Sequence, residues 1–447
     1  MKIGFAVSDI TPELGLYLTG YGMPERLATG VHSPLTATAA VICDGEKSAA
    51  VISLDWCTID WVLTCEFRAA ISEASGIEEK NILLCCTHTH SAPHTILVRT
   101  LGRVDVDPEN KGLEYARKCI PAVVDAVLRA KAAMRETAAC FAEGKTKVGV
   151  SRRGTDKNGT PRGFIADPDA ICDDNMTAVL FKDTDTMENI GIMIHCGAHN
   201  TAMGLDRNIS SDWCGVMKKR IAKRWNVPVL FLNGAIGDIG PRTNRWIEGK
   251  DFHGFGAGGG DGASSAEEVG YRAATDALSL LENMKDFRTD LPLRMNTVTI
   301  SLPQEIPMTE AEAKEILAKY DNCEKNGEEV PVDYQVAKVA VETWKKPLEP
   351  EFFFEQTVIA FGPVALAPFP FEMFSIFSLR LRKYGNYQYT LLCSNVNGRN
   401  AYMPDRGSIA YGGYEVNCRK LVRPYVLKAE AGDMAVSQTL ESLNNIK

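Results

Sequence analysis

The chain has no apolar run long enough to cross a membrane and no recognisable leader. None of its hydrophobic stretches approaches the roughly 18 consecutive apolar residues that a membrane helix needs. The N-terminal segment "MKIGFAVSDITP" is broken by Asp9 and Pro12, and it lacks the apolar core and cleavage site of a signal peptide. From these absences we expect a cytoplasmic protein without stable membrane insertion.

Paired cysteine motifs and an excess of basic charge are missing as well. The 13 cysteines form no C-x-x-C pair and mostly stand in apolar company, which indicates buried, reduced thiols. A net charge of −8 argues against nucleic acid or an anionic membrane as the main partner. The glycine-rich segment 253–265 is not followed by G-K-[ST], so it is not a phosphate-binding P-loop; a lid and a plain connector both stay open.

Strand-like and helix-like segments alternate along the 447 residues, which predicts an α/β protein with layered mixed sheets flanked by helices. We expect strands over 37–44, 48–56, 81–89, 190–196, 228–234, 295–303, 356–369 and 388–395, because these segments are rich in β-branched residues. We expect helices over 62–75, 112–135, 212–225, 264–283, 309–326 and 371–384, with a capping box in "SSAEE" at 264–268. The charged segment 304–351 is predicted to be a peripheral helical insertion.

Histidine is scarce, and five of the seven histidines follow two apolar strands. The first group is "CTHTHSAPH". If this segment is extended, His88 and His90 project from one face, because side chains at i and i+2 share a side of a strand. Imidazole is a common zinc ligand, but H-x-H alone is a weak signal, and a hydrogen-bonded strand end explains it more readily.

The second histidine group, "IMIHCGAHNTAMG", has the i, i+4 spacing of a helix at His195 and His199. The strand-like residues before it, Gly197 within it and the absence of H-E-x-x-H argue against a helical zinc motif. We therefore place His195 in or at the end of a strand and His199 in the following loop. Two such clusters together favour a metal site.

Three later segments carry further polar residues in special positions. The strand in "LFLNGAIGDIGPR" runs into a glycine-dense turn with Asn233, Asp238 and Gly240, which is either a ligand-binding turn or an ordinary one. In "APFPFEMF", Glu372 is predicted in the first turn of a helix, where the helix dipole favours a carboxylate. The turn-rich "AYMPDRGSIAYGGYE" supplies tyrosines that suit a binding surface or rim packing.

Taken together, these segments resemble the catalytic domain of the neutral/alkaline (non-lysosomal) ceramidase family. The resemblance is carried in order by "FAVSDITPELGLYLTGYG", "TGVHSPLTATAAVI", "CTHTHSAP", "AHNTAMGLDRNISSDWCG", "FLNGAIGDIGP", "PFPFE" and "YMPDRGSIAYGGYE". Several ordered motifs are far more specific than any one of them.

The resemblance implies one catalytic Zn²⁺, held by His88, His199, Glu372 and Tyr402. By the same resemblance His90 is the acid/base beside the metal, Tyr414 a hydrogen-bond donor to the developing oxyanion, and Arg152 the active-site arginine. Ser151 stands beside that arginine where the family has asparagine. Asn233, Asp238 and Gly240 belong to the turn expected to bind substrate. His195 falls outside the motifs, and no role follows for His94.

Two departures from the family pattern shape the functional prediction. The family turn reads G-D-x-S-P, whereas Gly240 occupies the serine position, so attack by a metal-activated water is the route that stays. The chain ends at Lys447 soon after Tyr414, and we expect residues 1–447 to form one catalytic domain without the family's C-terminal immunoglobulin-like domain. A small soluble substrate is then expected in place of ceramide.

The sequence thus predicts a zinc-dependent hydrolase that cleaves an amide bond. Hydrolysis of an ester, lactone or glycosidic bond, a metal-dependent lyase or isomerase, and a metal-free binding protein stay open as alternatives. An amidohydrolase barrel also uses H-x-H after a strand, but its later ligands are not evident here. Nothing in the sequence indicates the oligomeric state.

Overall fold

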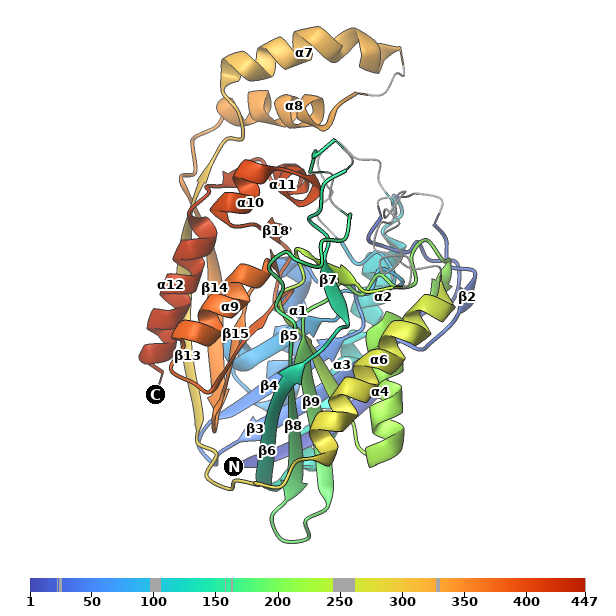
Figure 1. Ribbon diagram of the computed structural model, residues 1–447, viewed down its shortest axis with the longest axis vertical. Coiled ribbons are helices and arrows are strands. Elements are labelled where there is room, and N and C mark those ends of the chain that lie inside the picture. Colours follow the sequence, from blue (N-terminus) through green and yellow to red (C-terminus); the bar gives the residue numbers. More distant parts are fainter. Residues whose placement is uncertain are drawn as a thin grey trace.

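The computed structural model shows four stacked layers, in which two β-sheets pack face to face and helices cover both outer faces (Figure 1). The structure describes residues 1–21, 23, 26–96, 106–156, 158–161, 164–243, 262–326 and 330–446. The layered α/β class predicted from the sequence is confirmed. The predicted glycine-rich loop at 253–265 lies outside the described residues up to position 261.

Secondary structure covers most of the described chain. The strands are β1 (Lys2–Asp9), β2 (Gly30–Val31), β3 (Thr36–Cys43), β4 (Ser48–Leu54), β5 (Ile82–Cys86), β6 (Arg135–Lys145), β7 (Gly149–Ser151), β8 (Asn175–Asp183), β9 (Asn189–Cys196), β10 (Asn208–Ile209), β11 (Val229–Asn233), β12 (Ile239–Pro241), β13 (Leu293–Glu305), β14 (Glu351–Phe361), β15 (Val364–Pro368), β16 (Glu372–Met373), β17 (Tyr389–Cys393), β18 (Tyr402–Met403) and β19 (Val426–Leu427).

The helices are α1 (Trp61–Ser75), α2 (Lys111–Lys118), α3 (Ile120–Ala132), α4 (Asp212–Trp225), α6 (Ala263–Glu282), α7 (Glu310–Lys325), α8 (Val332–Trp344), α9 (Ser375–Tyr384), α10 (Arg406–Tyr411), α11 (Tyr414–Cys418) and α12 (Ala431–Asn444). Two short 3₁₀ turns, η1 (Glu79–Asn81) and η2 (Arg419–Leu421), complete the set. Among the described helices, none combines the length and the apolar character needed to cross a bilayer.

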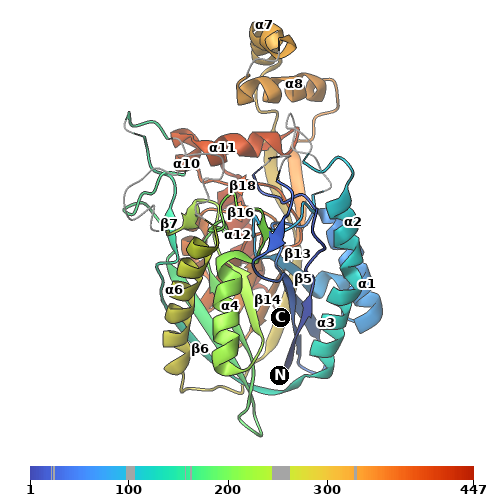
Figure 2. The same ribbon diagram turned by 90° about the vertical axis from the view of Figure 1, so that its right-hand side faces the viewer.

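The larger sheet has eight strands in the order β11-β9-β8-β6-β1-β3-β4-β5. Its two halves join where β1 and β6 pair through only Lys2 and Ile3. Helices α1 and α3 lie against one half and α4 and α6 against the other (Figure 2). Strands β5 and β11 are buried at every residue because both faces of this sheet are covered, which explains their unbroken apolar sequences.

The second sheet has five strands in the order β17-β15-β14-β13-β19. The core between the two sheets includes Phe5, Phe181 and Phe361, whose rings form a continuous row with centroids 5.5 and 6.0 Å apart. Helices α9 and α12 cover the outer face, with Phe377 and Ala435 in the cluster beneath them. No disulfide joins any of the 13 cysteines, all of which are described.

Several predicted elements need correction. Segment 356–369 is not one strand: β14 turns back into antiparallel β15 at Gly362, whose φ of 53° suits glycine. The capping box expected at 264–268 is absent, because α6 begins at Ala263 after Gly262. A capping box occurs instead at Thr309 and Glu312. Strands β1, β6 and β8 were not predicted, although they pair along most of their lengths.

Helices α7 and α8 form a hairpin between β13 and β14 and project from the end of the molecule at which α10 and α11 lie (Figure 1). Both helices fall within the charged segment 304–351. They share a small apolar cluster of their own around Ala313, Ala337 and Ala340. The hairpin is therefore an appendage to the four layers. The assignment of the whole chain to one catalytic domain stays a prediction.

Candidate metal centre

The H-T-H segment is a loop and not a strand. Strand β5 ends at Cys86, and His88 has a φ of 67°, in the left-handed region. The expectation that His88 and His90 project from one face of a strand is therefore wrong, because neither residue lies in a strand. The two rings nevertheless converge, with 3.2 Å between their Nε2 atoms. Left-handed backbone at a non-glycine residue costs roughly 1–3 kcal/mol and persists only where the surroundings fix it.

Hydrogen bonds to the end of β4 and the loop after it fix the backbone of the H-T-H segment. Backbone amides of Thr87 and His88 donate to the carbonyls of Leu54 and Trp56, at 2.9 and 2.8 Å. The amide of His90 donates to the carbonyl of Asn200, at 3.1 Å, in the segment that carries the other histidine cluster. The two predicted histidine segments are thus joined through backbone hydrogen bonds.

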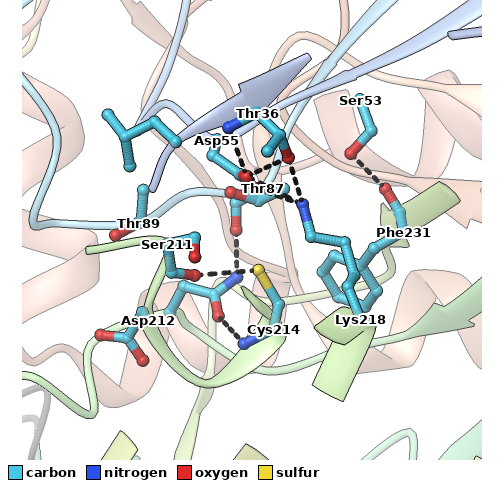
Figure 3. A network of polar contacts seen from close by, with 12 residues as sticks. Thr36, Ser53, Asp55, Thr87, Thr89, Ser211, Asp212, Cys214, Lys218 and Phe231 are labelled. Atoms are coloured by element: carbon cyan, nitrogen blue, oxygen red, sulfur yellow. Dashed lines mark hydrogen bonds and ion pairs between the residues drawn. The ribbon is translucent and has the colours of Figure 1, made fainter. Parts of the chain in front are cut away.

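A buried ion pair stabilises the loop after β4 from beneath. The Lys218 ammonium on α4 lies 2.7 and 2.8 Å from the two carboxylate oxygens of Asp55, and Thr36 donates to the same carboxylate (Figure 3). Asp55 is fully buried and lies between Leu54 and Trp56, the residues that accept hydrogen bonds from the H-T-H segment. Removing one partner of such a pair leaves an uncompensated charge, so the pair holds this loop in place.

His88 and His199 are oriented by carbonyl groups on their Nδ1 sides. His88 Nδ1 lies 2.8 Å from the carbonyl of Cys57, and His199 Nδ1 lies 2.6 Å from the carbonyl of Ile236. A carbonyl only accepts, so each Nδ1 carries the proton and each Nε2 presents a lone pair. Both rings are buried.

Glu372 completes a cluster of three acceptor atoms. Its Oε2 lies 3.1 Å from His199 Nε2 and 3.5 Å from His88 Nε2. Ligand atoms of these three residues all lie within 4.8 Å of one another. His199 Nε2 and Glu372 Oε2 are buried and have no hydrogen-bond partner among the described residues. Three acceptor atoms that face one another in a buried space make this cluster a candidate site for a metal ion.

Electrostatics agree with this reading. Burial raises the pKa of Glu372, but His88 and His199 outweigh it and hold that pKa well below its usual range, so the carboxylate is anionic. Burial and Arg152 lower the pKa of His199 to about 3, so this ring is neutral. Burial lowers the pKa of His88, but Cys57 and Glu372 raise it well above its usual value, so without a metal ion this ring takes up a second proton, which a bound metal ion would displace. The cluster thus draws in one positive charge, which a bound metal ion can supply.

The placement of Glu372 corrects a prediction. It does not open a helix: Glu372 and Met373 form the short strand β16, which pairs in parallel with Tyr402 and Met403 of β18. The amide of Glu372 donates to the carbonyl of Ala401, at 2.9 Å, and α9 begins only at Ser375. The strand pairing outweighs helix propensity here and sets Glu372 directly beside Tyr402.

Tyr402 is held beside His199 by Arg152. Its ring lies nearly parallel to the His199 ring, with centroids 6.3 Å apart and 24° between planes. The Arg152 guanidinium donates to the Tyr402 hydroxyl, at 3.2 Å, and to the carbonyl of Gly237, at 3.0 Å. Burial and Glu372 raise the pKa of Tyr402, while Arg152 lowers it. The predicted tyrosine ligand therefore adjoins the three-residue cluster.

Arg152 belongs to a buried charge cluster with Arg153 and Glu415. Arg152 Nε lies 3.0 Å from one Glu415 oxygen, and Arg153 Nη1 lies 2.5 Å from the other. Glu415 follows Tyr414, whose ring centroid lies 6.1 Å from that of Tyr402. Sequence reasoning missed Arg153 and Glu415, although each directly follows a predicted site residue.

The predicted substrate turn lies behind these residues. Asn233 is buried and its amide nitrogen donates to the carbonyl of Thr87, at 2.6 Å. Asp238 Oδ1 accepts hydrogen bonds from the amide and hydroxyl of Ser375, at 2.9 and 3.0 Å. Gly240 pairs with Val150 between β12 and β7. The turn thus supports the metal cluster, and direct substrate contact by these three residues stays a prediction.

The other histidines take separate positions. His195 lies in β9 and its Nε2 is 2.7 Å from the carbonyl of Leu392, so its i, i+4 spacing to His199 does not bring the two rings together at the cluster. His94 is half-buried, with its Nδ1 3.3 Å from the Thr19 hydroxyl.

Sequence reasoning also missed the residues that fix His90. The Arg26 guanidinium donates to the carbonyls of His90 and Thr19, at 2.7 and 3.0 Å. It also lies 4.7 Å from the Tyr21 ring, which in turn packs edge-on against the His90 ring at 4.9 Å. The only sequence feature that could have pointed to Arg26 is its position in a loop rich in glycine and proline. Its partners, however, come from distant segments.

Fold and site together define a layered α/β protein with a buried centre of two histidines, a glutamate and an adjoining tyrosine. The chain belongs to the neutral/alkaline non-lysosomal ceramidase family, whose N-terminal domain profile matches residues 1–302.

Relatives and solved structures agree with this family. Neutral ceramidase A of Dictyostelium discoideum is 24% identical over 54% of this chain and 36% of the relative. Neutral ceramidase 2 of Arabidopsis thaliana is 24% identical over 54% of this chain and 31% of the relative. These matches span about a third of the length of each curated relative. The structure of neutral ceramidase from Pseudomonas aeruginosa superposes with a TM-score of 0.72 and 18% identity, over 99% of this chain and 74% of that chain.

Proposed function

We propose that this protein is a zinc-dependent hydrolase that cleaves an amide bond in a small substrate with a metal-activated water. One observation carries the proposal: Nε2 of His88, Nε2 of His199 and Oε2 of Glu372 converge with their lone pairs facing one another. No proton donor lies between His199 and Glu372 among the described residues.

The donor set suits zinc. Two imidazole nitrogens and one carboxylate oxygen are a recurrent ligand set of catalytic zinc sites, which keep a further position open. Tyr402 supplies an additional oxygen beside the three donors, because its strand pairs with that of Glu372. A zinc ion bound there lowers the pKa of water to about 7 and polarises a carbonyl.

The surrounding residues supply proton transfer and orientation. Burial and the neighbouring His88 and His199 hold the pKa of His90 well below its usual value, so its ring is neutral. A neutral imidazole accepts a proton and returns it to a leaving nitrogen, which amide cleavage requires. Arg152 holds Tyr402 by a 3.2 Å hydrogen bond. Tyr414 is the proposed donor to the substrate carbonyl oxygen, in the role of an oxyanion stabiliser.

The choice of an amide bond is supported by the relatives, which are named neutral ceramidases. Gly240 has no side chain and so offers no hydroxyl as a nucleophile beside the centre. Direct attack by water is therefore the proposed route, and a small soluble amide is the proposed substrate class.

Metal content tests the ligand assignment directly. We expect about one zinc per chain in purified protein. We expect it to be lost in His88→Ala and in Glu372→Ala and to be retained in His94→Ala, whose ring lies outside the cluster. Folding of each variant is checked by circular dichroism. Full zinc retention in both ligand variants would contradict the assignment.

Activity on a panel of amides, esters, lactones and glycosides, measured with and without a chelator, tests the reaction. We expect chelator-sensitive hydrolysis of amides, recovered by added Zn²⁺. Hydrolysis that persists after the metal is removed would refute the water mechanism, and chelator-sensitive activity on esters or glycosides alone would refute the bond assignment.

A further inference from the structure

A small hollow with an uncharged lining, apolar except for Thr160, Tyr414 and Asn417, lies between the helical hairpin and α11. Its volume is about 300 Å³, and its walls include Pro161, Val332, Tyr414, Cys418 and Leu421. None of the residues that line it carries a charge. The volume is at the lower end of the range for small-molecule sites, and the walls suit an apolar group.

Tyr414 connects this hollow to the metal centre. Its ring forms part of the wall and also lies 6.1 Å from the ring of Tyr402, which packs beside His199. Tyr414 is therefore shared between the wall of the hollow and the aromatic group beside the cluster. A substrate with its reacting bond at the cluster can place another part of itself in the hollow.

Helix α8 contributes its first residue to the wall of the hollow and is attached to the layer below it. Lys420 of η2 lies 3.8 Å from Asp333 of α8, and the Tyr425 hydroxyl donates to the carbonyl of Pro347, at 3.1 Å. Helix α8 lies over α11 in both views (Figures 1 and 2). Val332, the first residue of α8, is 41% exposed. An apolar ligand group in the hollow would cover it.

We propose that this hollow is a subsite for a compact apolar arm of the substrate. The inference rests on the proposed function and narrows its substrate class to amides with such an arm. Absence of charge in the walls disfavours a charged arm, because a charge moved out of water needs a partner. Since α8 belongs to the insertion between β13 and β14, this insertion sets the selectivity.

The test compares kcat/KM for amides with methyl and longer apolar arms, in one series on the acyl side and in another on the amine side. In the wild type we expect kcat/KM to rise about fourfold for each methylene that becomes buried. Val332→Trp fills the hollow and should lower the ratio of long-arm to methyl activity to near one. Val62→Trp is the matched control: Val62 is 46% exposed on α1, and this ratio should not change. An unchanged ratio in Val332→Trp would overturn the subsite.

Alkylation of Cys418 gives a readout that needs no turnover. Cys418 is half-buried in the wall, whereas Cys65 is exposed on α1 and serves as the internal control. A non-hydrolysable ketone analogue of the long-arm amide should slow N-ethylmaleimide labelling of Cys418 severalfold and leave Cys65 unchanged. Protection without turnover of any amide would refute the proposed function and keep the subsite. Amide turnover with neither protection nor a change in the Val332→Trp ratio would refute the subsite alone.

Discussion

Replacement of Glu415 by glutamine tests whether the buried charge cluster beside the metal centre stabilises the fold. Glu415 is fully buried and is the shared partner of Arg152 and Arg153, at 3.0 and 2.5 Å. Glu415→Gln keeps the shape of the side chain but removes its charge. Two guanidinium groups, 1% and 9% exposed, would then lie together without a carboxylate.

The magnitude follows from the burial of all three groups. Removing one partner of a buried ion pair costs about 3–5 kcal/mol. Each arginine keeps carbonyl partners, Gly237 for Arg152 and Ser408 for Arg153, so complete unfolding is not expected. With an unfolding entropy of about 2.1 cal/mol/K per residue over 447 residues, this loss lowers Tm by roughly 3–5 °C.

The assay is urea-induced unfolding followed by circular dichroism, with a matched exposed pair as control. Glu66 also makes two contacts with an arginine, Arg117, at 2.9 and 2.8 Å, but this pair lies at the surface. Glu66→Gln should therefore cost less than about 1 kcal/mol. Added salt should diminish the effect at Glu66 and leave that at Glu415 unchanged. Equal losses in the two variants would refute the reasoning.

Two further predictions concern Asp238 and Arg26. Burial raises the pKa of Asp238 to about 7, so the folded state holds this proton more tightly than the unfolded chain does, and the wild type should lose stability as the pH rises from about 4 to 7. Asp238→Asn cannot ionise, so its urea midpoint relative to the wild type should rise between about pH 4 and 7; a constant difference would contradict this. Arg26→Met removes the donors to the carbonyls of His90 and Thr19, and we expect kcat to fall by about 10–100-fold with zinc content retained. Unchanged turnover would show that Arg26 does not position His90.

Sequence reasoning found the residues of the site better than it found their geometry. Its ordered motifs identified His88, His199, Glu372 and Tyr402, and three of these four form the acceptor cluster while the fourth adjoins it. The secondary structure that it predicted around two of these residues was wrong. It placed the H-T-H histidines on a strand and Glu372 in a helix, because residue patterns report propensity and not the hydrogen bonds that fix a loop.

Residues that only support the site gave little signal. Arg26 and Glu415 are charged residues within a loop and a short helix, and the sequence offers no reason to bury them. Their burial depends on partners that are far away in the chain: Arg26 binds carbonyls at His90 and Gly204, and Glu415 binds two arginines more than 250 residues earlier. A lone charged residue reads as solvent-exposed until the fold shows what surrounds it.

The sequence by itself determined the layered α/β class, the family and the residue types of the proposed metal ligands. Apolar periodicity and the choice of ligand types are local properties, and they can be read without a fold. Only the tertiary structure decided that the lone pairs of His88, His199 and Glu372 face one another, and that Tyr402 joins them through strand pairing. It alone placed Val332, at the start of α8, and Tyr414 in the wall of one hollow. Such proximity arises from long-range backbone pairing, because segments that are hundreds of residues apart must first meet in the folded sheets.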